Sequence, residues 1–148
     1  MKNPKKILII IQRSNGDVLF SLNLINALYE HFQSPIIDLL INDDIIAVAK
    51  LFPNVNSILT FSYPKKQNQR WRQERDILRS IFRKYDLSVN LTASDRSVVY
   101  GLIASKFSIS AIEKNIQKSW WKKLFLTHHY YFDINKHILL NNLEPLNL

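Results

Sequence analysis

The chain has 148 residues, a formal net charge of +8, no cysteine and two glycines. The absence of cysteine excludes a disulfide scaffold, a thiolate zinc site and a Cys nucleophile. Gly16 and Gly101 lie too far apart to form a glycine-rich dinucleotide fingerprint or a Walker loop. With 47% hydrophobic and 22% charged residues, the sequence is typical of one globular domain. Its excess of basic residues indicates an anionic partner.

Segments rich in β-branched residues alternate with helical patterns along the chain. Strands are predicted at Lys5–Gln12, Ile36–Ile41, Ser57–Phe61, Asp86–Leu91 and Phe107–Ser110. Helices are predicted at Val18–Phe32, from Asn42 to Leu51, from Trp71 to Phe82, from Arg96 to about Ser105 and, weakly, at Ile134–Asn142. Tyr63–Arg70 is predicted to be a polar loop, and the last six residues carry no structural signal. This alternation predicts an α/β fold, a Rossmann-like parallel sheet with helices on both faces.

No targeting segment is predicted. The basic N-terminus is followed by an apolar run, Ile7–Ile11, that is too short for a signal peptide. No run approaches the roughly 20 apolar residues of a membrane span. We therefore expect a cytoplasmic protein.

Ligands of such folds bind beyond the carboxyl ends of the strands, so the loops Arg13–Asp17, Tyr63–Arg70 and Leu91–Arg96 are the candidate site. In the first loop, Gly16 permits a positive φ or a close ligand approach. The N-terminus of the following helix could bind an anion. Asp17 could accept a proton from a bound hydroxyl, or it could simply cap the following helix.

Basic residues gather between Lys65 and Lys84. Those that precede the helix could hold phosphate or carboxylate groups, namely Lys65, Lys66 and Arg70. The row on one helical face is typical of a solvated surface, namely Arg72, Arg75, Arg79 and Arg83. Arg96 could either contact a ligand or pair with Asp95.

Two further clusters carry weaker signals. His128-His129 lacks a third ligand, so no metal site is expected. Trp120-Trp121 beside Lys122-Lys123 is more typical of core residues next to surface residues. A membrane-surface or base-stacking element is the alternative.

Several segments, taken in order, resemble glycosyltransferase family 9, the lipopolysaccharide heptosyltransferases. They are Lys6–Ile10 with Arg13-Ser14-Asn15-Gly16-Asp17-Val18, Ile37–Leu40, Phe52-Pro53-Asn54-Val55, Tyr85-Asp86-Leu87, Asp95-Arg96-Ser97 and Leu124–His128. The resemblance covers roughly residues 5–143. Asn90-Leu91-Thr92-Ala93 departs from it, because the family has Asp-x-Gln-Gly there.

The resemblance implies a GT-B enzyme whose N-terminal Rossmann-like domain binds the acceptor and whose C-terminal domain binds the nucleotide sugar. The reaction would be an inverting transfer, with Asp17 as general base. The acceptor, the anionic Kdo and phosphate region of the lipopolysaccharide inner core, would contact Arg13, Ser14, Asn15, Gly16, Lys65, Lys66, Arg70, Arg72 and Arg96. We expect residues 1–148 to form the acceptor-binding domain only, without the domain that binds ADP-heptose, and to be inactive alone. No cofactor is expected, and peripheral contact with the inner membrane is a hypothesis.

Two other interpretations of the sequence compete with that of an acceptor-binding domain. A non-enzymatic α/β module could bind nucleic acid through the Lys65–Lys84 face, although its aromatic residues do not alternate with the basic ones as a stacking platform requires. A phosphate-recognising regulatory domain could use the turn at Gly16-Asp17.

Overall fold

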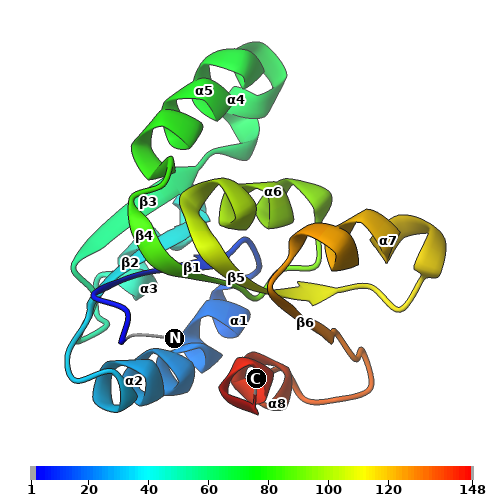
Figure 1. Ribbon diagram of the computed structural model, residues 1–148. Coiled ribbons are helices and arrows are strands. Elements are labelled where there is room, and N and C mark those ends of the chain that lie inside the picture. Colours follow the sequence, from blue (N-terminus) through cyan, green and yellow to red (C-terminus); the bar gives the residue numbers. More distant parts are fainter. Residues whose placement is uncertain (1–2, 148) are drawn as a thin grey trace.

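The β-rich segments of the chain form one parallel sheet in the computed structural model, which describes residues 3–147 (Figure 1). Its strands are β1 (Lys6–Ile11), β2 (Ile36–Asn42), β3 (Ser57–Phe61), β4 (Tyr85–Asn90), β5 (Ser105–Ile112) and β6 (His128–Tyr131). The α-helices are α1 (Asn15–Phe20), α2 (Leu22–His31), α3 (Ile46–Ala49), α4 (Tyr63–Asn68), α5 (Arg70–Ile81), α6 (Asp95–Ala104), α7 (Ile116–Phe125) and α8 (Ile138–Leu143). Short 3-10 helices occupy Asp43–Ile45 and Glu144–Asn147.

The strand order β3-β2-β1-β4-β5-β6 places the turning point of the fold at β1. The chain builds outward from β1 through β2 to β3, and then returns to the other side of β1 with β4, β5 and β6. Each neighbouring pair is parallel. The predicted Rossmann-like α/β class is therefore confirmed. In such sheets, ligands bind beyond the carboxyl ends of the strands where the order reverses, which here is between β1 and β4.

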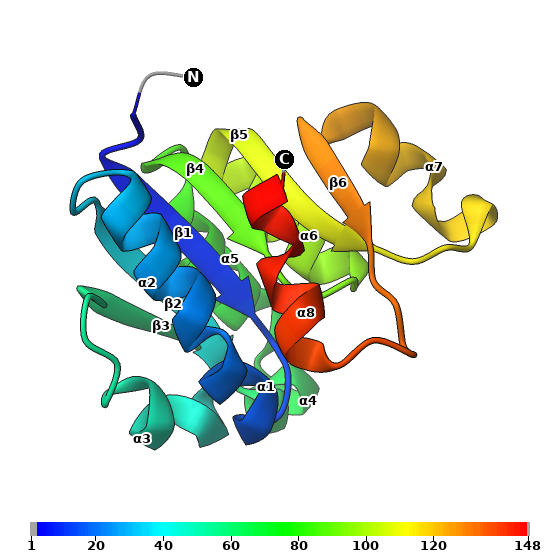
Figure 2. The ribbon, with the colours of Figure 1, turned by 90° about the horizontal axis from the view of Figure 1, so that it is seen from below.

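Strand β1 lies at the centre because both of its faces are apolar. Ile7, Ile9 and Ile11 face the layer that contains α2, while Leu8 and Ile10 face α5 and α6. Figure 2 shows α1, α2 and α8 on the near face of the sheet, with α5 and α6 behind it. A separate apolar cluster beneath α7 contains Val98, Ile112 and Leu126, against which Trp121 packs.

Several local predictions were wrong. Tyr63–Arg70 is mostly helical, because Pro64 occupies the first turn of α4, where its missing N–H is tolerated. The helix predicted from Trp71 to Phe82 is α5, but Trp71 is 83% exposed and Phe82, the residue after the helix, is 64% exposed, so neither belongs to its apolar face. That face is formed by Ile77 and Ile81.

The sequence also missed α7, β6 and the 3-10 helix Glu144–Asn147. The buried side of α7 contains Ser119 and Lys122, which interrupt the apolar period. Strand β6 consists of two histidines and two tyrosines, so it lacks the apolar run that identifies a central strand.

No helix within residues 3–147 is both long and apolar enough to cross a bilayer. Over the same range, no three side chains of His, Cys, Asp or Glu come together as metal ligands.

Candidate functional site

The carboxyl ends of β1 and β4 are joined directly. The backbone N–H of Gln12, just after β1, donates a 2.9 Å hydrogen bond to Oγ1 of Thr92, just after β4. Both residues are buried. This bond brings together two of the three loops that the sequence predicts as the candidate site, Arg13–Asp17 and Leu91–Arg96.

Asp17 does not cap the helix that follows β1. That helix starts at Asn15, with Ser14 at the N-cap, so Asp17 lies in the first turn. Gly16 does not have a positive φ, which corrects one of the two predicted reasons for a glycine there. Because α1 has only six residues, its dipole is small, and the cationic side chain that pairs with Asp17 is Arg13.

The Asp17 carboxylate faces the Arg13 guanidinium and is partly accessible. Its Oδ2 lies 3.8 Å from Arg13 Nη1, and the two side chains are 26% and 21% exposed. Arg13 is held from the other side by the Phe132 ring, whose centroid is 4.0 Å from Cζ. Behind this pair, Asn142 Nδ2 donates to the backbone oxygen of Asp17 at 3.3 Å. A carboxylate held in this way can accept a proton from a ligand hydroxyl.

Arg96 connects the ends of three strands. Its guanidinium stacks 3.8 Å above the Phe61 ring, at the end of β3. Its Nε–H donates to Oε1 of Gln12 and its Nη2 to the hydroxyl of Tyr63, both at 3.4 Å. Of the two predicted roles, the ion pair with Asp95 is wrong, because Asp95 pairs with Lys122 at 2.8 Å. Arg96 is thus held by stacking and by long hydrogen bonds that a ligand can replace.

Three buried side-chain atoms among the described residues have no hydrogen-bond partner, and all three lie at this edge. They are Nε2 of Gln12, Nε of Arg13 and Oδ1 of Asn42. Asn42 Nδ2 donates to the backbone oxygen of Arg13 at 3.4 Å, which places the three residues together. An orphaned buried polar group costs about 1–3 kcal/mol, so these two donors and one acceptor are available to bind water or a polar ligand.

The predicted basic residues lie further out on α4 and α5. Lys65, Lys66, Arg70 and Arg72 are all exposed. Lys66 Nζ lies 6.0 Å from the centroid of the Tyr63 ring, and Tyr63 contacts Arg96, so α4 adjoins the inner cluster. A hollow of about 580 Å³ opens beside Tyr63, Pro64 and Lys66. The predicted residues thus divide into an inner group near Asp17 and an outer cationic group.

Sequence reasoning missed part of the inner group. Gln12, Asn42, Phe132 and Asn142 were not predicted to belong to the site. Gln12 and Asn42 carried a usable signal, because each is a polar residue at the end of an apolar strand. Phe132 and Asn142 reach the site from segments distant in sequence, and nothing in their own neighbourhood indicates this.

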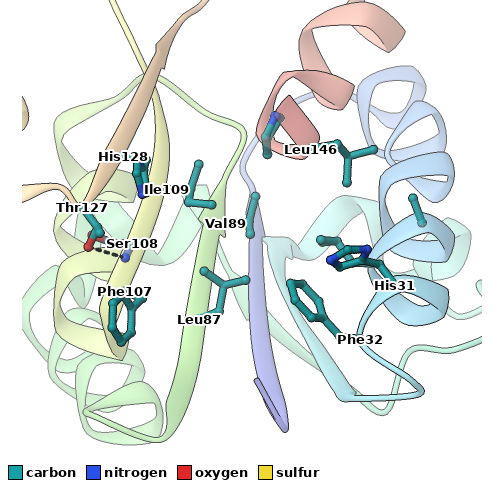
Figure 3. Close-up of a pocket in the computed structure, with 13 residues that line it drawn as sticks. His31, Phe32, Leu87, Val89, Phe107, Ser108, Ile109, Thr127, His128 and Leu146 are labelled. Atoms are coloured by element: carbon teal, nitrogen blue, oxygen red, sulfur yellow. Dashed lines mark hydrogen bonds between the residues drawn. The ribbon is translucent and has the colours of Figure 1, made fainter. Parts of the chain in front are cut away.

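A second hollow, of about 640 Å³, lies away from this edge (Figure 3). In Figure 3, one wall of the hollow is formed by His31, the last residue of α2, and by Phe32, which follows it. The opposite wall is formed by Phe107, Thr127 and His128, and Leu87 and Val89 of β4 lie between the two walls. None of the predicted site residues lines it. Its walls are mainly apolar, so we place the candidate site at the carboxyl edge, where the charged and orphaned polar groups lie.

Comparison with solved structures identifies the fold. The structure of a glycosyl transferase family 9 protein from Veillonella parvula superposes with a TM-score of 0.81 and 16% identity, over 99% of this chain and 42% of that one. E. coli heptosyltransferase WaaC with ADP-2-deoxy-2-fluoro heptose gives 0.77 and 13%, over 94% and 46%. E. coli ADP-heptose lps heptosyltransferase II gives 0.64 and 19%, over 86% and 35%.

The chain spans less than half the length of each of these proteins. No family model matches it, and no curated protein matches its sequence. At these identities the likeness establishes a shared Rossmann-like fold. The resemblance to glycosyltransferase family 9 predicted from the sequence is therefore confirmed in three dimensions, as a common architecture.

Proposed function

We propose that this chain is the acceptor-binding domain of an inverting, heptosyltransferase-like glycosyltransferase. The observation that carries the proposal is the meeting of a partly accessible carboxylate, Asp17, with the orphaned polar atoms of Gln12, Arg13 and Asn42. A sugar offers hydroxyl groups that both donate and accept, and so satisfies this mixed set. The shared fold with heptosyltransferases supports the same conclusion.

In the proposed reaction, Asp17 acts as general base. Its carboxylate takes the proton of an acceptor hydroxyl as that oxygen bonds to the anomeric carbon of the donor sugar. The bond from the anomeric carbon to the nucleoside diphosphate breaks, and the diphosphate leaves with the electron pair. Arg13, 3.8 Å from the carboxylate, limits its orientation without closing it to a hydroxyl.

The cationic residues give the acceptor its charge specificity. Arg96 offers a planar fork that matches a carboxylate, once the 3.4 Å bonds to Gln12 and Tyr63 are exchanged. Lys65, Lys66, Arg70 and Arg72 form an outer set that suits phosphate groups. This arrangement fits an acceptor with both carboxylate and phosphate groups, such as the Kdo region of the lipopolysaccharide inner core.

Donor binding belongs to a second domain in this proposal. Transfer requires donor and acceptor to be aligned, and that alignment supplies much of the rate. This domain alone is accordingly expected to bind the acceptor and to have little transferase activity. Activity would require a donor domain that binds a nucleotide sugar such as ADP-heptose.

Calorimetry on the purified chain tests the binding half of the proposal. A Kdo-bearing lipid A analogue should bind, while ADP-heptose should not. Arg96→Ala should weaken acceptor binding by about 10-fold or more, since a hydrogen-bonded charge is lost. Arg79→Ala, an exposed arginine on α5, is the matched control and should change it by less than about 3-fold. Equal losses in both variants, or salt-sensitive binding of an oligonucleotide alone, would contradict the proposal.

Kinetics tests the catalytic half. In a complete or complemented enzyme, Asp17→Asn should reduce turnover by about 10²–10⁴-fold, the usual contribution of a general base. Acceptor affinity and the circular dichroism spectrum should change little, because the amide has nearly the same shape. Unchanged turnover would exclude Asp17 as the base.

A further inference from the structure

Helix α7 has its charged residue inward and its large apolar residues outward. Lys122 is fully buried, whereas Ile116, Trp120 and Leu124 are 71%, 61% and 71% exposed. The three apolar residues follow one another at steps of four, so they form one continuous ridge, here called the α7 ridge. A helix packed on a sheet in water normally shows the opposite distribution.

Helix α7 carries two lysines besides Lys122, and one of them, Lys123, is adjacent to Leu124 of the α7 ridge. Lys118 is exposed, and Lys123 is half-buried with its Nζ 5.2 Å from the centroid of the Tyr131 ring. Within the part of the chain that the structure describes, neither lysine forms an ion pair. Phe125, the last residue of α7, adds a further apolar side chain that is 65% exposed.

This combination favours a lipid surface over a protein partner. Lysine is depleted in protein–protein interfaces. At a bilayer, by contrast, its stem can lie along apolar surface while the ammonium group reaches the headgroups. Tryptophan is enriched at the same depth, and a net charge of +8 attracts the protein to anionic lipid. Helix α7 also lies at one end of the molecule, away from α2, in both views (Figures 1 and 2).

We propose that the α7 ridge is a membrane-contact surface that lies in the headgroup region of an anionic lipid bilayer, with Trp120 as its interfacial anchor. The ridge is formed by helix surface alone and shares no residue with the carboxyl-edge site. Binding to lipid is thus independent of any acceptor.

The test is sedimentation with vesicles of phosphatidylglycerol and phosphatidylcholine that contain no glycolipid. Trp120→Ser combined with Leu124→Ser should lower the partition coefficient by about 10-fold or more. The matched control combines Trp71→Ser with Leu51→Ser, the same residue types at 83% and 80% exposure outside α7, and should stay within about 2-fold. Because all four residues are exposed, both variants should fold, and their urea midpoints verify this.

Two further measurements test the position of Trp120 in the bilayer and the dependence of binding on charge. Brominated acyl chains should quench the tryptophan emission of the bound protein, and Trp120→Phe should remove most of that quenching while retaining binding. Wild-type binding should fall when phosphatidylglycerol is omitted or when salt is raised. The loss of quenching supports a bilayer contact made by α7, and the dependence on lipid charge and salt supports an anionic bilayer as the partner.

Other results would overturn it. Undiminished binding by the ridge variant, or an equal loss in the control, would place the contact elsewhere. If vesicles fail to bind the wild type while the ridge variant abolishes self-association in analytical ultracentrifugation, the ridge contacts a second copy of the chain.

Discussion

Lys122, the buried lysine of α7, allows a test of the contacts that position the loop and helix start before Arg96. Lys122 Nζ donates to Glu113 at 2.6 Å and to the backbone oxygen of Ala93 at 3.0 Å, and it pairs with Asp95 at 2.8 Å. Ala93 and Asp95 belong to the loop and helix start that position Arg96. Replacement of Lys122 therefore removes the ammonium that ties α7 to this loop, and it leaves two carboxylates facing each other.

The size of the effect follows from two separable contributions. Lys122→Met retains an apolar stem and loses only the charge. Hydrogen bonds to charged groups contribute about 1.5–3 kcal/mol, but Glu113 and Asp95 are 37% and 72% exposed and regain water, so about 1–2 kcal/mol should be lost. Lys122→Ala also removes three buried methylene groups at about 0.8 kcal/mol each, which raises the total to about 3–4 kcal/mol.

Urea unfolding followed by far-ultraviolet circular dichroism measures both variants. The midpoints should fall in the order wild type, Lys122→Met, Lys122→Ala, at a constant dependence on urea. Lys118→Ala, an exposed lysine on the same helix, should change stability by less than about 0.5 kcal/mol. A Met variant as stable as the wild type, or an Ala variant no less stable than the Met variant, would refute the reasoning.

Three other predictions concern the rest of the chain. Gly16→Ala should raise the free energy of unfolding in urea by about 0.5 kcal/mol, because the φ of Gly16 is not positive and an added Cβ meets no atom within 4 Å. The same substitution should weaken acceptor binding in calorimetry. The pKa of His129 is lowered from 6.5 by burial and by Lys123, so the folded state resists a proton that the unfolded state accepts. Wild-type stability should therefore fall more than that of His129→Gln between about pH 7 and about pH 5. Burial raises the pKa of Tyr85 and Tyr130 well above 10, and the phenolate absorbance of these residues should appear only with alkaline unfolding.

The fold could be predicted because it depends on patterns that are local in sequence. The run Ile7–Ile11 is apolar at every position, which only a strand covered on both faces requires. The regular alternation of strands and helices then predicted that the strands are parallel. The pattern failed at α7, where Lys122 is buried because Glu113 and Asp95 neutralise it. A side chain whose burial depends on partners 9 and 27 positions away cannot be identified from the helical period.

The position of the candidate site could be predicted from the sequence, but its side-chain contacts could not. Asp17 and Arg96 could be placed at the carboxyl edge of the sheet because each lies in the turn or first helical turn that comes after a strand. How Arg96 is held could not be predicted, since Phe61 and Tyr63 approach it from another strand and helix. The orphaned atoms of Gln12 and Asn42 were equally hidden, because a lack of partners becomes visible only when every neighbour is in place.

Only one of the two glycines is explained by the fold. A Cβ on Gly101 would lie 3.3 Å from Oγ of Ser88, which also donates to the Gly101 backbone oxygen, so helix α6 needs a small residue to approach β4. Gly16 has no such neighbour and no positive φ, although glycine is among the least favourable residues in a helix. Its bare backbone is next to Asp17 at the mouth of the cluster. In the proposed acceptor site, close approach of a ligand to this backbone would account for a glycine at this position.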